Sequence, residues 1–152
     1  MKTVTQFGKE LDKSSYSWNE STRTFSSNEN NLVLDFNNID NVTFKTGYDC
    51  TFKTGSNCTF DTGFNCIFKT GSGCTFKTGF NCTFKTGYNC VVVRRDVFEV
   101  IVLNEDNNHI KLNGYSIKGY EHIKPTRTIT INGKEIELSE ESFNNLKTQL
   151  RD

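Results

Sequence analysis

The feature that most constrains this chain is an eight-residue repeat in its centre. Six consecutive octads run from Thr43 to Cys90 and read TFKTGYDC, TFKTGSNC, TFDTGFNC, IFKTGSGC, TFKTGFNC and TFKTGYNC. A unit this short buries its apolar side chains only by stacking on neighbouring units. Alanine, the best helix former, is absent from the chain, whereas Thr and Phe favour strands. The repeat therefore predicts a solenoid of stacked β-strands.

Each octad divides into a strand and a turn. Side chains alternate along a strand, so Cys50, Phe52 and Thr54 share one face. Thr51 and Lys53 share the other face. Because Phe favours the interior and Lys favours solvent, the Cys–Phe–Thr face is predicted to line the core. The remaining Gly-x-Asn or Gly-x-Asp forms the corner, where glycine permits a positive φ and Asn or Asp tolerates one.

The residue after the glycine indicates how many octads form one coil. Taken at every second octad, it gives two columns: Tyr48, Phe64, Phe80 and Ser56, Ser72, Tyr88. A coil of three octads would mix aromatic residues with serine in two of its three columns. We therefore predict an all-β fold, a parallel β-solenoid or β-helix with two strands in each 16-residue coil. The crossover rule for parallel strands favours right-handed winding.

Degenerate octads extend the pattern on both sides of the repeat. Leu34 and Val42 take the Cys position before it, and Phe98 and Val100 take the Cys and Phe positions after it. These matches predict a solenoid over residues 32–103. An N-terminal cap segment would then occupy residues 1–31 and a C-terminal cap residues 104–152, because bare solenoid ends are open sheet edges.

Each cap contains a predicted hairpin. Residues 16–18 and 23–25 flank a turn in the N-terminal cap. In the C-terminal cap, residues 128–138 flank Asn132-Gly133, a strong hairpin signal. Ser139 then resembles the N-cap of a short helix over residues 140–150, whose apolar stripe consists of Phe143, Leu146 and Leu150.

The six cysteines, one per octad, are predicted to be small buried side chains with free thiols. A zinc site usually has a C-x-x-C pair, and the repeat contains none. Neighbours in a column would lie about 4.8 Å apart, beyond the usual Cβ separation of a disulfide. We therefore expect no metal and no cofactor. Free thiols favour a reducing compartment, hence an intracellular place in the host cytoplasm or a place in a virion.

Composition and motifs exclude several classes of function. Lys and Arg number 18 and Asp and Glu also number 18, so the chain is not a globally basic nucleic-acid binder. Ser–His–Asp, H-E-x-x-H and phosphate-loop patterns are absent, and we expect no enzymatic activity. The chain has no apolar run of membrane-spanning length, and its first residues lack the apolar core of a signal peptide.

Two columns are candidate interaction sites. The Lys column, Lys53, Lys69 and Lys85, is either an anion-binding stripe or a solvated face that prevents sheet association. The aromatic column, Tyr48, Phe64 and Phe80, either forms an exposed ridge for a partner or is covered. The covering segment would be the N-terminal one, with Phe7, Tyr16, Trp18 and Phe25.

The last corner of the repeat contains two further candidates. Arg94 and Arg95 could together clamp an anion, although pairing with Asp96 and Glu99 is the favoured interpretation. Val91, Val93 and Ile101 are predicted to point outward near the C-terminal cap, where we expect simple packing.

Three segments resemble uncharacterised octapeptide-repeat proteins of tailed bacteriophages and large DNA viruses. They are TFKTGSNCTF, residues 90–100 and residues 111–115, within a similarity that covers roughly residues 43–118. The resemblance implies a β-solenoid of viral origin and no catalytic residues.

A rigid ladder of identical side chains suits binding, so our first hypothesis is a phage-encoded interaction protein that inhibits a host or defence protein. The alternatives are a virion structural component of tail, fibre or capsid decoration, and nucleic-acid binding through the Lys column. The first hypothesis requires a host or viral protein partner, and a homo-oligomer stays open.

Overall fold

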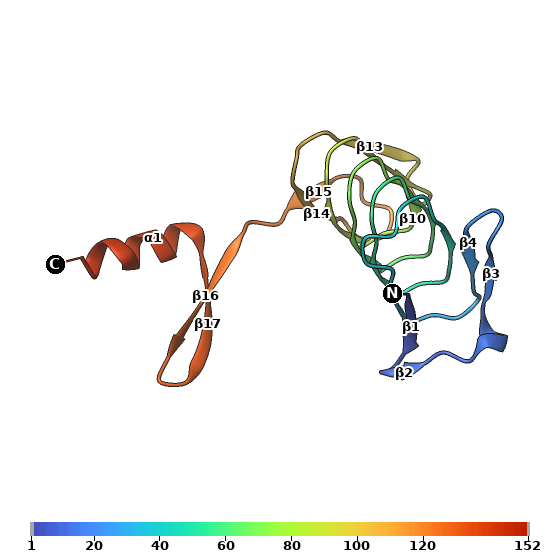
Figure 1. The fold of residues 1–152 in the computed structure, drawn as a ribbon. Helices are drawn as coiled ribbons and strands as arrows, with labels where there is room; N and C mark the ends of the chain where they lie inside the picture. Colours follow the sequence, from blue (N-terminus) through green and yellow to red (C-terminus); the bar gives the residue numbers. More distant parts are fainter. Residues whose placement is uncertain (1, 152) are drawn as a thin grey trace. The chain divides into compact units, whose positions relative to one another are not determined.

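The repeat folds as a parallel β-solenoid with two strands in each 16-residue coil, as predicted. The computed structural model describes residues 2–151, which divide between Glu121 and His122 into two compact units. The stacked coils of the first unit run from teal to yellow in Figure 1. Neighbouring strands of one wall lie 16 residues apart, so that Phe44 pairs with Phe60 and Phe52 with Phe68.

Alternate strands form the two walls of the solenoid. One wall contains β4 (Thr24–Ser26), β6 (Thr43–Lys45), β8 (Thr59–Asp61), β10 (Thr75–Thr78) and β12 (Cys90–Arg94). The other wall contains β5 (Leu32–Asp35), β7 (Thr51–Lys53), β9 (Ile67–Lys69) and β11 (Thr83–Thr86). Because β4 already pairs in parallel with β6, the parallel stack begins earlier than the predicted start at Leu32.

The N-terminal segment closes the first coil. The predicted hairpin is present as β3 (Ser17–Asn19) and β4, with Trp18 opposite Phe25. Strand β1 (Thr3–Gln6) pairs antiparallel with β5 and with the short β2 (Lys9–Glu10). A 3₁₀ helix, Lys13–Ser15, links the two strand pairs. Antiparallel strands thus satisfy the backbone groups that the first coil would leave open.

The C-terminal end of the solenoid differs from the prediction. Strand β13 (Glu99–Leu103) turns back and pairs antiparallel with β12, and β14 (Asn108–Leu112) pairs antiparallel with β11. The predicted inward positions of Phe98 and Val100 are therefore wrong, since both side chains are exposed. Ile101 was predicted to point outward and is instead buried opposite Val92. Strand β15 (Tyr120–His122) follows β14 in the sequence.

Two interlocked ladders of phenylalanine form the core. Within a wall the rings stack, with centroids of Phe60 and Phe76 4.9 Å apart and nearly parallel. Between walls they meet edge to face, with Phe60 and Phe68 5.1 Å apart at 76°. Both arrangements suit the ring quadrupole. The six rings of the ladders are buried, which confirms that the Phe position of the octad lines the core: Phe44, Phe52, Phe60, Phe68, Phe76 and Phe84.

Small residues fill the corners of the core. All six cysteines are buried as free thiols, in one column per wall. The Cys74 thiol lies 3.4 Å from the backbone nitrogen of Cys58 in the preceding coil. Each inward threonine donates its hydroxyl proton to the carbonyl of the following glycine, as Thr86 does to Gly87 at 3.0 Å. The turn backbone thus satisfies the buried hydroxyls.

The two turn positions that recur in the octads, Gly and Asn or Asp, have different structural roles. The left-handed conformation belongs to the Asn or Asp position, with φ 55° at Asn65 and 57° at Asn57. The preceding glycines do not adopt positive φ, and their role is close stacking. A Cβ added at Gly63 would lie only 3.0–3.1 Å from the backbone and Cβ of Tyr48 in the neighbouring coil. Glycine is therefore required by the distance between coils.

We expect Gly63→Ala to destabilise the protein by about 1–3 kcal/mol, the usual cost of overpacking. The added methyl group would contact backbone, which cannot move aside without separating two coils. Chemical denaturation followed by circular dichroism measures the change. Asn65→Gly at the same corner is the control, because glycine adopts positive φ without strain. Equal stability of Gly63→Ala and wild type would contradict this account of the corner.

The buried thiols predict a defined pattern of alkylation. In the folded protein all six cysteines should react with iodoacetamide far more slowly than in denaturant, because none is accessible. Mass spectrometry counts the modified thiols over time. The control is Thr75→Cys, which places a thiol on the exposed face of β10 and should be modified at once. Rapid modification of a native cysteine would show that the coils open.

The second unit confirms the predicted hairpin and helix. Strands β16 (Thr126–Ile131) and β17 (Lys134–Ser139) pair antiparallel, and α1 (Glu140–Gln149) follows. The Ser139 side chain accepts a hydrogen bond from the Ser142 amide, which makes it the N-cap. Neither α1 nor any other helical segment in residues 2–151 has the length and hydropathy needed to cross a bilayer.

Candidate functional site

The Lys column lies on the outer face of β7, β9 and β11. Lys53 is in register with Lys69, and Lys69 with Lys85. Adjacent strands lie about 4.8 Å apart, so the ammonium groups form a regularly spaced row. All three side chains are exposed, and none forms an ion pair within residues 2–151.

The ends of the Lys column are marked by two other residues. Asp35 on β5 pairs in register with Lys53, and His109 on β14 with Lys85. Burial of the imidazole, and then the positive charge of Lys85, lower the pKa of His109. The histidine is therefore neutral near pH 7 and adds no charge to the row.

A groove of about 440 Å³ runs along the corner beside the Lys column. Lys53 and Lys69 line one side of it, together with the turn that contains Ser56. Asp40 also lines the groove, but its carboxylate accepts a hydrogen bond from the Ser56 amide at 2.6 Å. The ammonium groups of Lys53 and Lys69 can bind an anionic side chain there, whereas the Thr54 and Thr70 hydroxyls already donate to glycine carbonyls.

The aromatic column is a stack of parallel rings at the opposite corner. Ring centroids lie 4.8 Å apart from Tyr48 to Phe64 and 4.9 Å from Phe64 to Phe80. Tyr115 closes the stack edge to face against Phe80. Tyr48 remains 39 % exposed, and the two phenylalanines are half-buried by each other. The rings therefore stabilise the corner and leave only a narrow apolar edge in solvent.

The N-terminal segment does not cover the aromatic column. Tyr16 stacks on Phe25 at 5.2 Å, and Trp18 lies 6.1 Å from Phe36, so these rings close the end of the core. Phe7 is 77 % exposed. Of the two possibilities left open by the sequence, the structure places the column at the surface.

The two adjacent arginines are structural groups. The fully buried Arg94 guanidinium donates two hydrogen bonds to the Asp96 carboxylate and further ones to the carbonyls of Gly114 and Ile117. Glu99 lies 3.7 Å away, so pairing with Asp96 and Glu99 is confirmed. Arg95 instead pairs with Asp61 and donates to the Thr62 carbonyl, a contact the sequence did not predict. Neither guanidinium is available as an anion clamp.

We expect Asp96→Ala to destabilise the protein by about 3 kcal/mol, because it removes the nearer of the two carboxylates that pair with a buried guanidinium. Asp61→Ala is the control. It removes a partner of Arg95 on the surface and should cost at most about 1 kcal/mol. Denaturant titrations measure the free energy of unfolding of both variants. Equal destabilisation by the two substitutions would show that the buried pair of Arg94 and Asp96 contributes no more to stability than the surface pair.

The same pair predicts a pH dependence. Burial raises the pKa of Asp96, but the hydrogen bonds from Arg94 and the Ser116 amide outweigh it and hold the pKa below its ordinary value. Asp96 therefore stabilises the fold above the pKa of the unfolded chain, and this contribution is lost as the pH falls through the lower, folded pKa. The stability difference between wild type and Asp96→Ala should narrow in acid. Denaturant titrations at a series of pH values measure it, and a constant difference would contradict the assignment.

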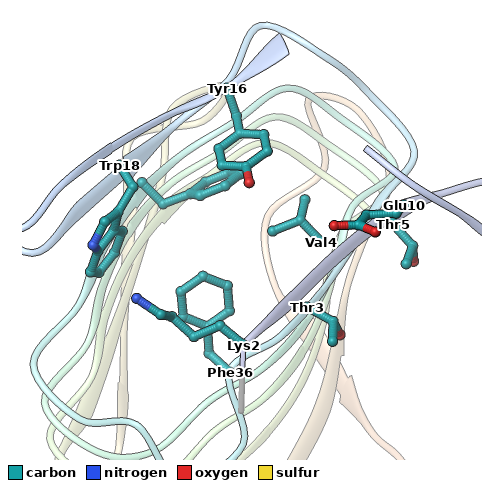
Figure 2. Close-up of a pocket in the computed structure, with 9 residues that line it drawn as sticks. Lys2, Thr3, Val4, Thr5, Glu10, Tyr16, Trp18 and Phe36 are labelled. Carbon is teal, nitrogen blue, oxygen red and sulfur yellow. The ribbon is translucent and has the colours of Figure 1, made fainter. Parts of the chain in front are cut away.

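A pocket of about 500 Å³ opens at the N-terminal end of the core (Figure 2). The rings of Tyr16, Trp18 and Phe36 line it, and Glu10 lies across the opening from Trp18. The Lys2 ammonium lies 4.0 Å from the centroid of the Trp18 ring, a cation–π contact within the chain. Because Lys2 already occupies the face of the indole, we interpret the pocket as the capped end of the solenoid interior.

The sequence revealed the two columns but missed other features. The pocket combines residues from β1, β2, β3, β4 and the segment after β5, so no local motif marks it. The contact between Arg95 and Asp61 joins residues more than four octads apart. No group of three or more metal-ligating side chains converges within residues 2–151.

Comparison of the chain with family models, curated proteins and solved structures finds no match.

Proposed function

We propose that this chain is a non-enzymatic protein-interaction module that binds an acidic surface of a partner protein through the Lys column. The supporting observation is the register of Lys53, Lys69 and Lys85 on consecutive strands, where none of the three forms an ion pair within residues 2–151. Like charges on adjacent strands repel and lower the stability of the free protein. Carboxylates of a partner would relieve this repulsion.

The surroundings of the column favour a protein partner. Val33 and Ile67, 45 % and 51 % exposed, lie on the same outer face as the lysines. A partner would therefore bury apolar area beside charge pairs, the usual anatomy of a protein interface. Nucleic-acid grooves instead place stacking aromatics beside the basic groups. Here the aromatic residues come just before β7, β9 and β11, and the lysines lie near the ends of the same strands. The aromatic column and the Lys column therefore lie at opposite edges of this wall.

The resemblance to repeat proteins of bacteriophages and large DNA viruses extends the proposal. We infer a virus-encoded protein that inhibits a host or defence protein by occupying its acidic surface. Inhibition by surface occupancy requires no catalytic group on this chain. It requires a rigid surface, which the coil-to-coil hydrogen bonds and stacked core provide.

Affinity purification tests this function. The tagged chain is incubated with a nuclease-treated lysate of the cells in which the protein is naturally made, and mass spectrometry identifies what it retains. The test variant is Lys53→Gln/Lys69→Gln. The matched control, Lys45→Gln/Lys77→Gln, removes the same charges at the same octad position on the other wall. We expect one protein to bind wild type and control, and its affinity for the test variant to fall about tenfold.

Three results would contradict the proposal. Equal retention by both variants would mean that the Lys column is a solvated face. Retention that requires a parallel lysate without nuclease treatment and falls steeply with salt would support the nucleic-acid alternative. Retention of virus-particle components alone would support a structural role in the virion.

A further inference from the structure

The edge strands of the two large sheets differ in length and in polarity. Strands β2, β3 and β15 contain two or three residues, and each includes a charged or strongly polar side chain. Strand β13 ends its sheet with five residues, Glu-Val-Ile-Val-Leu. Natural edge strands avoid sheet-to-sheet association through short length, lysine, proline or bulges. Within the part of the chain that the structure describes, β13 alone among these four has none of them.

The single charge on β13 does not protect its edge. The Glu99 carboxylate accepts hydrogen bonds from the Gly119 amide and lies 3.7 Å from the Arg94 guanidinium. By contrast, Val100 and Val102 are 62 % and 56 % exposed. They lie opposite Val93 and Val91, so four valines form one apolar outer face across β12 and β13.

Hydrogen bonding defines which backbone groups β13 leaves open. The amides of Val91 and Arg95 donate to carbonyls of the preceding coil, at Cys74 and Thr78. Because donors alternate along a strand, Val92 faces β13 and bonds its partner Ile101. The N–H and C=O groups of Val100 and Val102 therefore point away from the sheet. No hydrogen bond from residues 2–151 reaches them across this edge.

These open groups are self-complementary. In an antiparallel pair of β13 strands centred on Ile101, Val100 lies opposite Val102 of the second copy, and each such pair exchanges both hydrogen bonds. The two valines also pack against each other on the outer face. Glu99 lies opposite Leu103, so no like charges meet. A two-fold axis through Ile101 gives a closed, isologous contact.

We propose that β13 is a dimerisation strand, which joins the β12–β13 wall of one copy to the same wall of a second copy in an antiparallel pair centred on Ile101. The occupant is a second copy because register, hydrogen-bonding groups and side-chain charges all match under the same two-fold operation. The Lys column lies on the other wall, so this contact is separate from the proposed partner site.

Sedimentation of the full chain over a wide concentration range tests the proposal. Wild type should change from monomer to dimer as the concentration rises. Val100→Lys should raise the dissociation constant about tenfold or more, because it alters two symmetry-related cross-strand pairs. Val33→Lys is the matched control, an exposed valine on the outer face of the internal strand β5, and should dimerise as wild type does. Circular dichroism verifies that each variant folds.

A charge pair tests the register. In Val100→Lys/Val102→Glu, the lysine of each copy would face the glutamate of the other, so dimerisation should return toward the wild-type dissociation constant. In wild type, amide hydrogen exchange at Val100 and Val102 should slow as the concentration rises. A monomer at every concentration overturns the proposal. So does a dimer that Val100→Lys leaves unchanged, or one that the double variant fails to restore.

Discussion

The contact between the two phenylalanine ladders is the interaction on which the rest of the structure depends. Each ring stacks on the ring of the next coil in its own wall and meets rings of the other wall edge to face. These contacts fix the 16-residue coil and the distance between walls. The outer surface of the walls has the same regularity, because the residue at each outward position of the octad repeats at the spacing of the strands.

The same regularity explains the character of the surfaces on the two walls. A periodic wall presents rows of one residue type, and it converges no group of different residues on a point. Lys53, Lys69 and Lys85 form such a row, as do the rings of Tyr48, Phe64 and Phe80. The exceptions occur where the period ends. There, Arg94 is buried with Asp96, and β13 leaves an apolar edge.

Much of the fold could be predicted because six near-identical octads repeat the same pattern of inward, outward and turn residues. Coil length, inward faces, hairpins and the terminal helix all followed from spacing and capping residues. The reversal at β13 could not, since Val-Ile-Val alternates equally well in a parallel or an antiparallel strand. The loop before it shifts the phase by one residue, which exchanges the faces of Val100 and Ile101. The partners of Arg95 and the N-terminal pocket depend on contacts between distant segments, for which the sequence has no local signal.

The central claim is that two octads form one coil, since this alone brings the three lysines together. Nuclear Overhauser contacts between backbone protons of isotope-labelled protein test it most directly. The account predicts contacts between Phe52 and Phe68, and between Lys53 and Lys69, at a separation of 16 residues. Contacts between Phe52 and Phe76 instead would mean three octads in each coil. That result would place Lys53 beside Lys77 and separate it from Lys69, so the Lys column would not exist and the account would be contradicted.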